Sequence, residues 1–273
     1  MVLRIFGSSL LAVSVALALW LFGETGAVFL LSFFAVCSQC ELCRLMERFP
    51  SRPAIANLVF WTIVIMFGSW CLRPPCPGVG LTAIAAIFST VCAVRKLQPR
   101  QLLSHLAPTL FALFYVPFTM QFGTMMLRDG GTVGLHLLGW SIAVSKLGDI
   151  GGLFVGSRCG SHPLAAAYSP KKTLEGFFGA IALATAGGFL LCLLANRHCR
   201  FPLSPFLATV LAAAAAVVGA VADLFESALK RQSGLKDSGK MIPGIGGCLD
   251  LCDSLFFTLP MLYVAMQFSC CFG

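Results

Sequence analysis

Two pairs of acidic residues, each pair three positions apart, are the strongest sign of chemistry in this 273-residue chain. They are Asp223 with Glu226 and Asp250 with Asp253, and each pair stands where an apolar stretch meets a polar one. Residues at positions i and i+3 share one face of a helix, and carboxylate oxygens are the ligands that hard divalent cations prefer. The pairs therefore predict a cation site, with Asp149 as a further candidate ligand. The alternative is a rim of ion pairs with neighbouring basic residues.

Basic residues suited to phosphate accompany these acids. Lys171 and Lys172 stand at the predicted start of a helix, where free backbone N–H groups favour a bound phosphate. A second basic group, in which the arginine can bind phosphate through two parallel hydrogen bonds, comprises Lys230, Arg231, Lys236 and Lys240. Glycines that let the backbone approach a ligand closely follow at Gly244, Gly246 and Gly247. Acids, bases and glycines together predict a site for a nucleotide or polyphosphate with a divalent cation.

Two other patterns carry less weight. Residues 234–240 read GxxxxGK, but Met241 replaces the hydroxyl residue that a phosphate-binding P-loop needs, and no strand is predicted before it. Cys37, Cys40 and Cys43 form a CxxCxxC run without an evident fourth ligand. Thiols inside apolar segments usually behave as small hydrophobic groups, so we do not expect a metal there.

The elements that position these residues are predicted to be membrane-spanning helices. The chain is 58% hydrophobic and 11% charged, with a mean hydropathy of +0.88, against about 25% charged residues in an average globular domain. A helix needs roughly 20 apolar residues to cross a bilayer. We expect an all-α polytopic integral membrane protein with about nine transmembrane helices, at roughly 5–22, 25–40, 56–72, 80–94, 102–122, 131–148, 174–194, 203–223 and 252–270.

One continuous membrane domain is expected, with residues 1–145 as a lipid-facing scaffold and 146–273 as the catalytic region. With the N-terminus in the cytoplasm and every span crossing, 15 of the 19 basic residues fall on the inner side. The acid pairs then lie at the cytoplasmic face. The net charge of +8 follows from this topology and from anionic lipid headgroups, so no nucleic-acid partner is expected. Ala16 and Ala18 leave a cleaved signal peptide as the alternative to a retained first helix.

The segment from Ser227 to Asp253 resembles the C-terminal signature of phosphatidate cytidylyltransferases, the CDP-diacylglycerol synthases. The residues in register are Ser227, Lys230, Arg231, Lys236, Asp237, Gly239, Ile242, Pro243, Gly246, Gly247, Asp250 and Asp253. Upstream, GDIGGLFVGSRCG and YSPKKTLEGFFGA are similar to two further segments of that family, so that the resemblance covers residues 148–259. Ile245 and Leu251 stand where the family usually has His and Arg.

The resemblance implies a transfer of CMP from CTP to phosphatidate, which releases pyrophosphate. The implied catalytic residues are Lys230, Arg231, Lys236 and Asp237, and the implied substrate-binding residues are Lys171, Lys172, Ser227, Gly246 and Gly247. Asp223, Asp250 and Asp253 are the first candidates to bind Mg²⁺, with Glu226 and Asp149 as secondary ligands and a second metal ion left open. The expected partners are CTP, phosphatidic acid and membrane lipids, with a homodimer left open, at the cytoplasmic face of the inner (plasma) membrane.

Three alternatives stay open. A CTP-dependent transferase or kinase acting on another lipid, such as a polyprenol or an ether lipid, would need the same residue types. The replacements at Ile245 and Leu251 keep an inactive relative of the family in consideration. A transporter or channel would place acids in the middle of its spans, whereas here they gather near one predicted face, which favours an enzyme.

Overall fold

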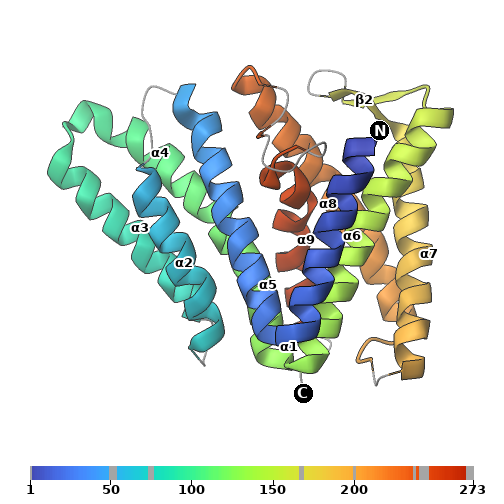
Figure 1. Ribbon diagram of the computed structural model, residues 1–273. Coiled ribbons are helices and arrows are strands. Elements are labelled where there is room, and N and C mark those ends of the chain that lie inside the picture. Colours follow the sequence, from blue (N-terminus) through green and yellow to red (C-terminus); the bar gives the residue numbers. More distant parts are fainter. Residues whose placement is uncertain are drawn as a thin grey trace. The chain divides into compact units, whose positions relative to one another are not determined.

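The computed structural model describes residues 2–48, 54–72, 77–165, 169–198, 201–235, 238–239 and 246–268. Helices make up nearly all of this part of the chain (Figure 1). The chain divides into two compact units, one formed by Met1–Arg128 with Gln232–Cys252 and the other by Asp129–Arg231 with Asp253–Gly273. Each unit is therefore built from segments that are far apart in the sequence.

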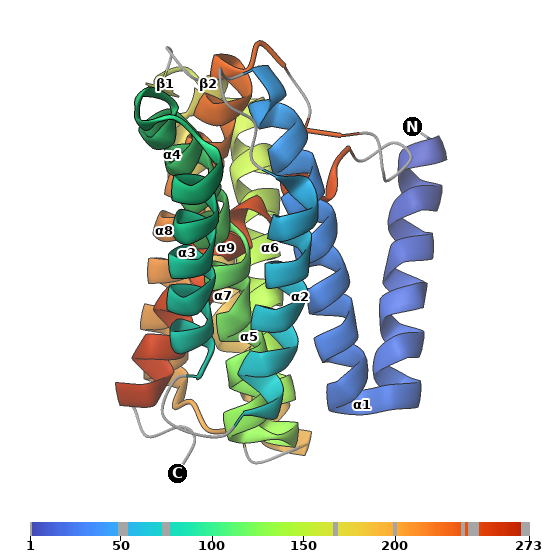
Figure 2. The same ribbon diagram turned by 90° about the vertical axis from the view of Figure 1, so that its left-hand side faces the viewer.

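The first unit contains a series of apolar helices. They are α1 (Val2–Leu45), the 3-10 turn η1 (Met46–Arg48), α2 (Ile55–Cys71), α3 (Pro77–Lys96), α4 (Pro99–Tyr115) and most of α5 (Pro117–Gly130). Gly23 adopts a φ of 53°, which bends α1 into two arms (Figure 2); this left-handed conformation favours glycine. Val116 separates α4 from α5 just before Pro117, which has no N–H group to continue the hydrogen-bond ladder.

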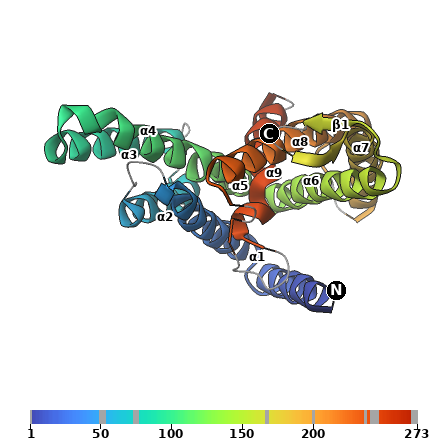
Figure 3. The same cartoon turned by 90° about the horizontal axis from the view of Figure 1, so that it is seen from above.

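The second unit contains α6 (Thr132–Cys159), α7 (Leu174–His198), α8 (Pro205–Gln232) and the greater part of α9 (Cys248–Phe268). Helices α6 and α7 lie side by side (Figures 1 and 3). Glycines allow this close approach, because a Cβ atom on Gly151 would lie 2.5 Å from the carbonyl oxygen of Gly179. Small residues of this kind are typical of packed membrane helices.

A short β-hairpin connects α6 to α7 at one end of the two helices (Figure 3). Its strands β1 (Pro163–Ala165) and β2 (Ser169–Thr173) pair antiparallel, with Pro163 opposite Thr173. The hairpin corrects the prediction that Lys171 and Lys172 begin a helix, since both lie on β2. The helix starts at Leu174 because the Thr173 hydroxyl accepts the N–H of Gly176 at 3.2 Å, the contact that a helix N-cap residue makes.

Seven helices in the described part of the chain are long and apolar enough to cross a membrane, so the protein is an all-α polytopic membrane protein. Every predicted span overlaps a helix, but α2 has only 17 residues and the count of nine spans is not confirmed. Two predicted ends were wrong. The span 131–148 continues as α6 to Cys159, and the span 203–223 continues as α8 to Gln232. Polar residues after the apolar stretch remain helical there, and the ion pair between Glu226 and Lys230 supports the last turns of α8 at 3.0 Å.

Candidate functional site

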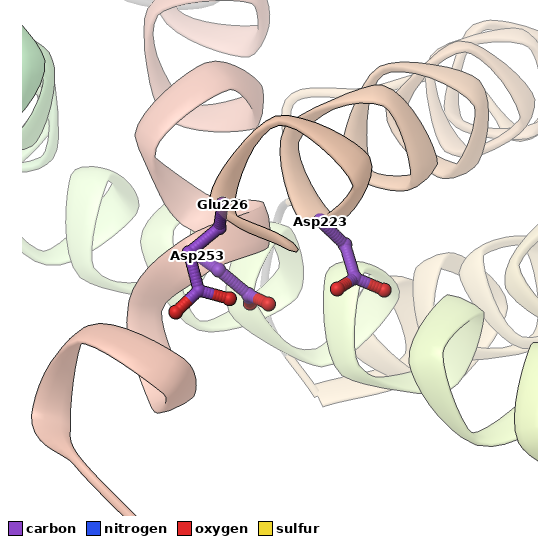
Figure 4. Close-up of side chains that lie close together, drawn as sticks. All are labelled: Asp223, Glu226 and Asp253. Atoms are coloured by element: carbon purple, nitrogen blue, oxygen red, sulfur yellow. The ribbon is translucent and has the colours of Figure 1, made fainter. Parts of the chain in front are cut away.

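Three carboxylates come together where α8 and α9 meet in the second unit. One oxygen from each of Asp223, Glu226 and Asp253 lies within 4.8 Å of the others, and Figure 4 shows the side chains of Glu226 and Asp253 side by side with that of Asp223 next to them. Glu226 is 1% exposed and Asp253 8% exposed, whereas Asp223 is half-buried. We call these residues the carboxylate cluster. The cluster contains both residues of the first predicted acid pair, Asp223 and Glu226, and Asp253 from the second pair.

Lysines bind the carboxylate cluster directly. Lys172 Nζ lies 2.6 Å from Asp223 Oδ2, and Lys230 Nζ lies 3.0 Å from Glu226 Oε2. Burying charges without partners is costly, and these ion pairs reduce that cost. The two lysines were predicted as phosphate ligands from widely separated segments, and the structure brings both to the cluster.

Asp149 lies in a neighbouring network rather than in the carboxylate cluster. Its Oδ2 atom is 2.8 Å from Lys146 Nζ and accepts the Ser254 hydroxyl at 3.3 Å. Lys146 also donates to the Ser254 hydroxyl at 3.3 Å. Since Ser254 follows Asp253, this network adjoins the cluster through the backbone of α9. Lys146 and Ser254 were not among the predicted site residues.

A cavity of about 570 Å³ opens beside these groups, between α6, α7, α8 and β2. Its charged lining residues are Asp149, Lys171, Lys172 and Asp223, and hydroxyl groups are added by Ser145, Ser157, Ser169 and Thr173. Much of the remaining wall has little or no side chain, as at Gly148, Gly152, Gly156, Gly176, Ala216 and Gly219. The cavity therefore offers cationic groups for phosphate next to an apolar surface.

The β-hairpin that carries Lys171 and Lys172 is fixed to the start of α7 by Glu175. The carboxylate of Glu175 accepts the backbone N–H groups of Ser161 at 3.1 Å and of His162 at 3.2 Å, and it contacts His162 Nδ1 at 2.6 Å. The backbone N–H of Leu174 also donates to the carbonyl of His162 at 2.8 Å. These contacts hold the strand that places the two lysines in the wall of the cavity.

Asp250, a predicted metal ligand, has a different set of contacts in the first unit. Its Oδ2 atom accepts the backbone N–H groups of Gly247 at 3.0 Å and of Ser238 at 3.3 Å. Gly246 has a φ of 129°, a conformation that glycine tolerates and other residues rarely adopt. We call residues 238–247 the glycine-rich segment. Asp250 thus fixes the backbone N–H groups at the two ends of this segment. It is not a member of the carboxylate cluster.

The remaining predicted residues have separate outcomes. Ser227 is half-buried on α8, one position after Glu226, and Arg231 lies exposed in the last turn of that helix. Lys236 and Asp237, together with Lys240 and Ile245, lie outside the described residues. Sequence reasoning missed Glu41, a buried acid whose carboxylate contacts the glycine-rich segment. Its position inside an apolar stretch was the available signal, because buried charges in such stretches usually have a function.

Comparison with known proteins agrees with the resemblance noted in the sequence. The model of the cytidylyltransferase family matches residues 2–269. A phosphatidate cytidylyltransferase of Thermotoga maritima is 32% identical over 204 residues, which are 74% of this chain and 73% of that protein. Proteins of the same name are 28% identical over 241 residues in Staphylococcus saprophyticus, covering 87% of each chain, and 26% identical over 263 residues in Staphylococcus haemolyticus, covering 95% of this chain and 96% of the relative. The family match includes the first 145 residues, where the sequence had indicated only hydrophobic spans, and the chain belongs to the cytidylyltransferase family.

Proposed function

We propose that the protein is a phosphatidate cytidylyltransferase, a membrane enzyme that transfers CMP from CTP to phosphatidate and produces CDP-diacylglycerol and pyrophosphate. The observation that carries this proposal is the carboxylate cluster, which reaches the wall of a largely apolar cavity through Asp223 and its ion-pair partner Lys172. Relatives named phosphatidate cytidylyltransferase support the choice of reaction.

The cavity suits the headgroup end of phosphatidate. Lys171 and Lys172 can hold the lipid phosphate, while the glycine and alanine wall accommodates the glycerol and the first carbons of the acyl chains. The rest of each chain would stay in the bilayer, because a volume of about 570 Å³ holds only part of a two-chain lipid. This arrangement keeps the reacting phosphate beside charged groups and the acyl chains in an apolar environment.

The reaction itself asks little of a general base. The phosphate of phosphatidate is already an anion near neutral pH, and its oxygen can attack the α-phosphorus of CTP in line while pyrophosphate leaves. The difficulty is the approach of two polyanions, so catalysis depends on positioning and on neutralising charge. We assign this neutralisation to Lys171, Lys172 and Lys230, joined by Arg231 and Lys236 as the sequence signature implies.

The carboxylate cluster fits a divalent cation. Its oxygen donors are those that Mg²⁺ prefers, two of its three members are buried, and their oxygens are close enough to share one ion. Asp223, Glu226 and Asp253 would hold Mg²⁺, which when bound would offset negative charge on the phosphates. The predictions that Asp149 and Asp250 are ligands, and that a second ion binds, stay predictions.

The glycine-rich segment before α9 would receive the phosphates of CTP. Gly246 has a backbone conformation that glycine tolerates, and Asp250 holds the N–H of Gly247 in a fixed place. Ser227 and Asp237 are expected to contact substrate or to orient the neighbouring basic side chains, as the family signature implies. The segment belongs to the first unit, and its role follows from the resemblance together with these local contacts.

The proposed membrane topology has nine crossings with the N-terminus in the cytoplasm. It is supported by the distribution of the basic residues, 15 of 19 on one side. The site would then face the cytoplasm, where CTP is found, at the inner (plasma) membrane. A homodimer is compatible with this topology, and no nucleic-acid partner is proposed.

The test is incubation of the purified protein in detergent with CTP labelled at the α-phosphate, phosphatidate and Mg²⁺, followed by lipid extraction. We expect the label to enter the lipid phase, with one pyrophosphate released for each CDP-lipid formed and no reaction in EDTA. Release of CDP with formation of a lipid phosphate would instead identify a kinase. Labelling of a polyprenol phosphate or an ether lipid in place of phosphatidate would also contradict the proposal, as would the absence of any labelled lipid.

A further inference from the structure

Glu41 is a buried acid to which the proposed reaction gives no role. It lies close to the end of α1 and is only 2% exposed. Its Oε2 atom accepts the backbone N–H of Leu249 at 2.8 Å and the hydroxyl of Ser238 at 3.2 Å. These partners stand at the start of the glycine-rich segment and just after its end, about 200 residues further along the chain. A single carboxylate on α1 therefore holds both ends of that segment within the first unit.

Two glycines of the segment make room for this carboxylate. A Cβ atom on Gly239 would lie 2.7 Å from Glu41 Cδ and closer still to Oε1. On Gly247 it would lie 2.8 Å from Glu41 Cδ and would also collide with the hydroxyl of Ser238. Real Cβ atoms essentially never come within 3.0 Å of another atom in this way. Both positions thus need glycine because the Glu41 side chain is packed against them.

Asp250 holds the same segment through different atoms. Ser238 donates its N–H to Asp250 and its hydroxyl to Glu41. Gly247 donates its N–H to Asp250, while its Cα side faces Glu41. Two carboxylates from separate helices therefore fix the two residues that enclose the segment. Burying Glu41 in an apolar helix costs free energy that an apolar residue would not cost, which indicates that its contacts with the segment serve the reaction.

We propose that Glu41 is a positioning residue of the nucleotide site, which holds Ser238 and Leu249, at the start of the glycine-rich segment and just after its end, where that segment can receive the phosphates of CTP. This inference rests on the proposed function, because it takes CTP as the ligand of that segment. Glu41 itself touches the protein backbone and a serine hydroxyl rather than substrate. Its removal should therefore weaken CTP binding while leaving the use of phosphatidate nearly unchanged.

The first test compares Glu41→Ala and Ser238→Ala with the wild-type protein in the labelled-CTP assay. Loss of hydrogen bonds to a buried carboxylate should raise the KM for CTP by roughly 10- to 100-fold in Glu41→Ala, with the KM for phosphatidate changed less than about twofold. Ser238→Ala removes one of the two donors and should raise the KM for CTP by a smaller factor. It also keeps the test decisive if Glu41→Ala does not fold. Equal increases in both KM values, or none, would overturn the inference.

The second test uses the packing against Gly239. Gly239→Ala should impair CTP use because the new Cβ collides with Glu41, to which its three nearest atoms all belong. In the double variant Glu41→Ala/Gly239→Ala the collision is gone, so the KM for CTP should equal that of Glu41→Ala alone. The matched control is Gly80→Ala, where a Cβ meets nothing within 4 Å, and it should behave as wild type. Additive effects of the two substitutions would refute the packing argument.

A third measurement does not depend on activity. Trypsin can cleave after the lysines and arginine of the segment 230–240, and release of its anchor should speed that cleavage in Glu41→Ala, with bound CTP protecting the wild-type protein. If the wild type transfers no CMP but cleavage still rises in the variant, the proposed function fails while the anchoring by Glu41 stands. If the wild type is active and the variant matches it in both cleavage rate and KM for CTP, the inference fails alone.

Discussion

Asp253→Asn tests whether the carboxylate cluster is a cation site. The substitution keeps the shape of the side chain and an oxygen that can still accept the backbone N–H of Ser254, which donates to Oδ1 at 2.6 Å. Two unit charges separated by 4.8 Å repel each other by about 3.5 kcal/mol at an effective dielectric constant of 20. Asp253 takes part in two such pairs, and 4.8 Å is the largest separation within the cluster, so the substitution relieves at least about 7 kcal/mol of repulsion before the neighbouring lysines are counted.

The ion pairs with Lys172 and Lys230 offset much of this repulsion. We therefore expect the variant without Mg²⁺ to be more stable than the wild type by on the order of 1 kcal/mol. With Mg²⁺ the order should reverse, because a ligand at 100 times its Kd stabilises the folded state by about 2.7 kcal/mol, and the variant loses most of that gain. Transfer of CMP should fall below detection.

The assay is thermal unfolding of the detergent-solubilised protein over a Mg²⁺ titration, with labelled-CTP transfer measured on the same samples. Asp129→Asn is the matched control, because Asp129 lies outside the cluster and accepts hydrogen bonds from Tyr263 at 2.6 Å and Gln267 at 3.2 Å. An amide oxygen can accept both, so its Mg²⁺ response should equal that of the wild type. A wild-type Mg²⁺ response or normal transfer in Asp253→Asn would refute the assignment.

Three further substitutions probe the surroundings of the cavity. Gly151→Ala should destabilise the protein by about 1–3 kcal/mol, since its Cβ would lie 2.5 Å from the Gly179 carbonyl oxygen, whereas Gly139→Ala on the same helix meets nothing within 4 Å and should be neutral in thermal unfolding. Lys172→Met should raise the KM for phosphatidate at least 10-fold in steady-state kinetics, because a charge-assisted hydrogen bond is worth about 1.5–3 kcal/mol. Glu175→Ala should free the β-hairpin, which faster tryptic cleavage after residue 172 would reveal.

The helical architecture could be predicted from the sequence because long apolar runs leave few alternatives in a membrane. The ends of the helices could not, since hydropathy falls at Asp223 whereas the backbone hydrogen bonds of α8 continue to Gln232. The β-hairpin was missed because the boundary between its second strand and α7 depends on the N-cap contact of Thr173 and on the contacts of Glu175.

The candidate site could be predicted in part. The spacing of Asp223 and Glu226 places them on one helix face, and the two lysines that contact the cluster were among the predicted site residues, whose binding of phosphate stays a prediction. The spacing could not show that Asp253 would join that pair while Asp250 binds backbone N–H groups. Glu41 contacts residues about 200 positions away, and a contact of that range depends on how the helices pack, which no local pattern in one sequence records.

The cavity wall has a consequence for how the enzyme's substrate range can change. Nine of the twenty residues that line the cavity are glycine or alanine. Their side chains are already so small that shortening them would hardly enlarge the cavity. Apart from Ala→Gly, single substitutions at these positions reduce the space, and selection in the laboratory should readily yield variants restricted to smaller lipids. Variants that accept bulkier lipids should instead arise at the few large lining residues, Leu153, Leu164 and Phe177.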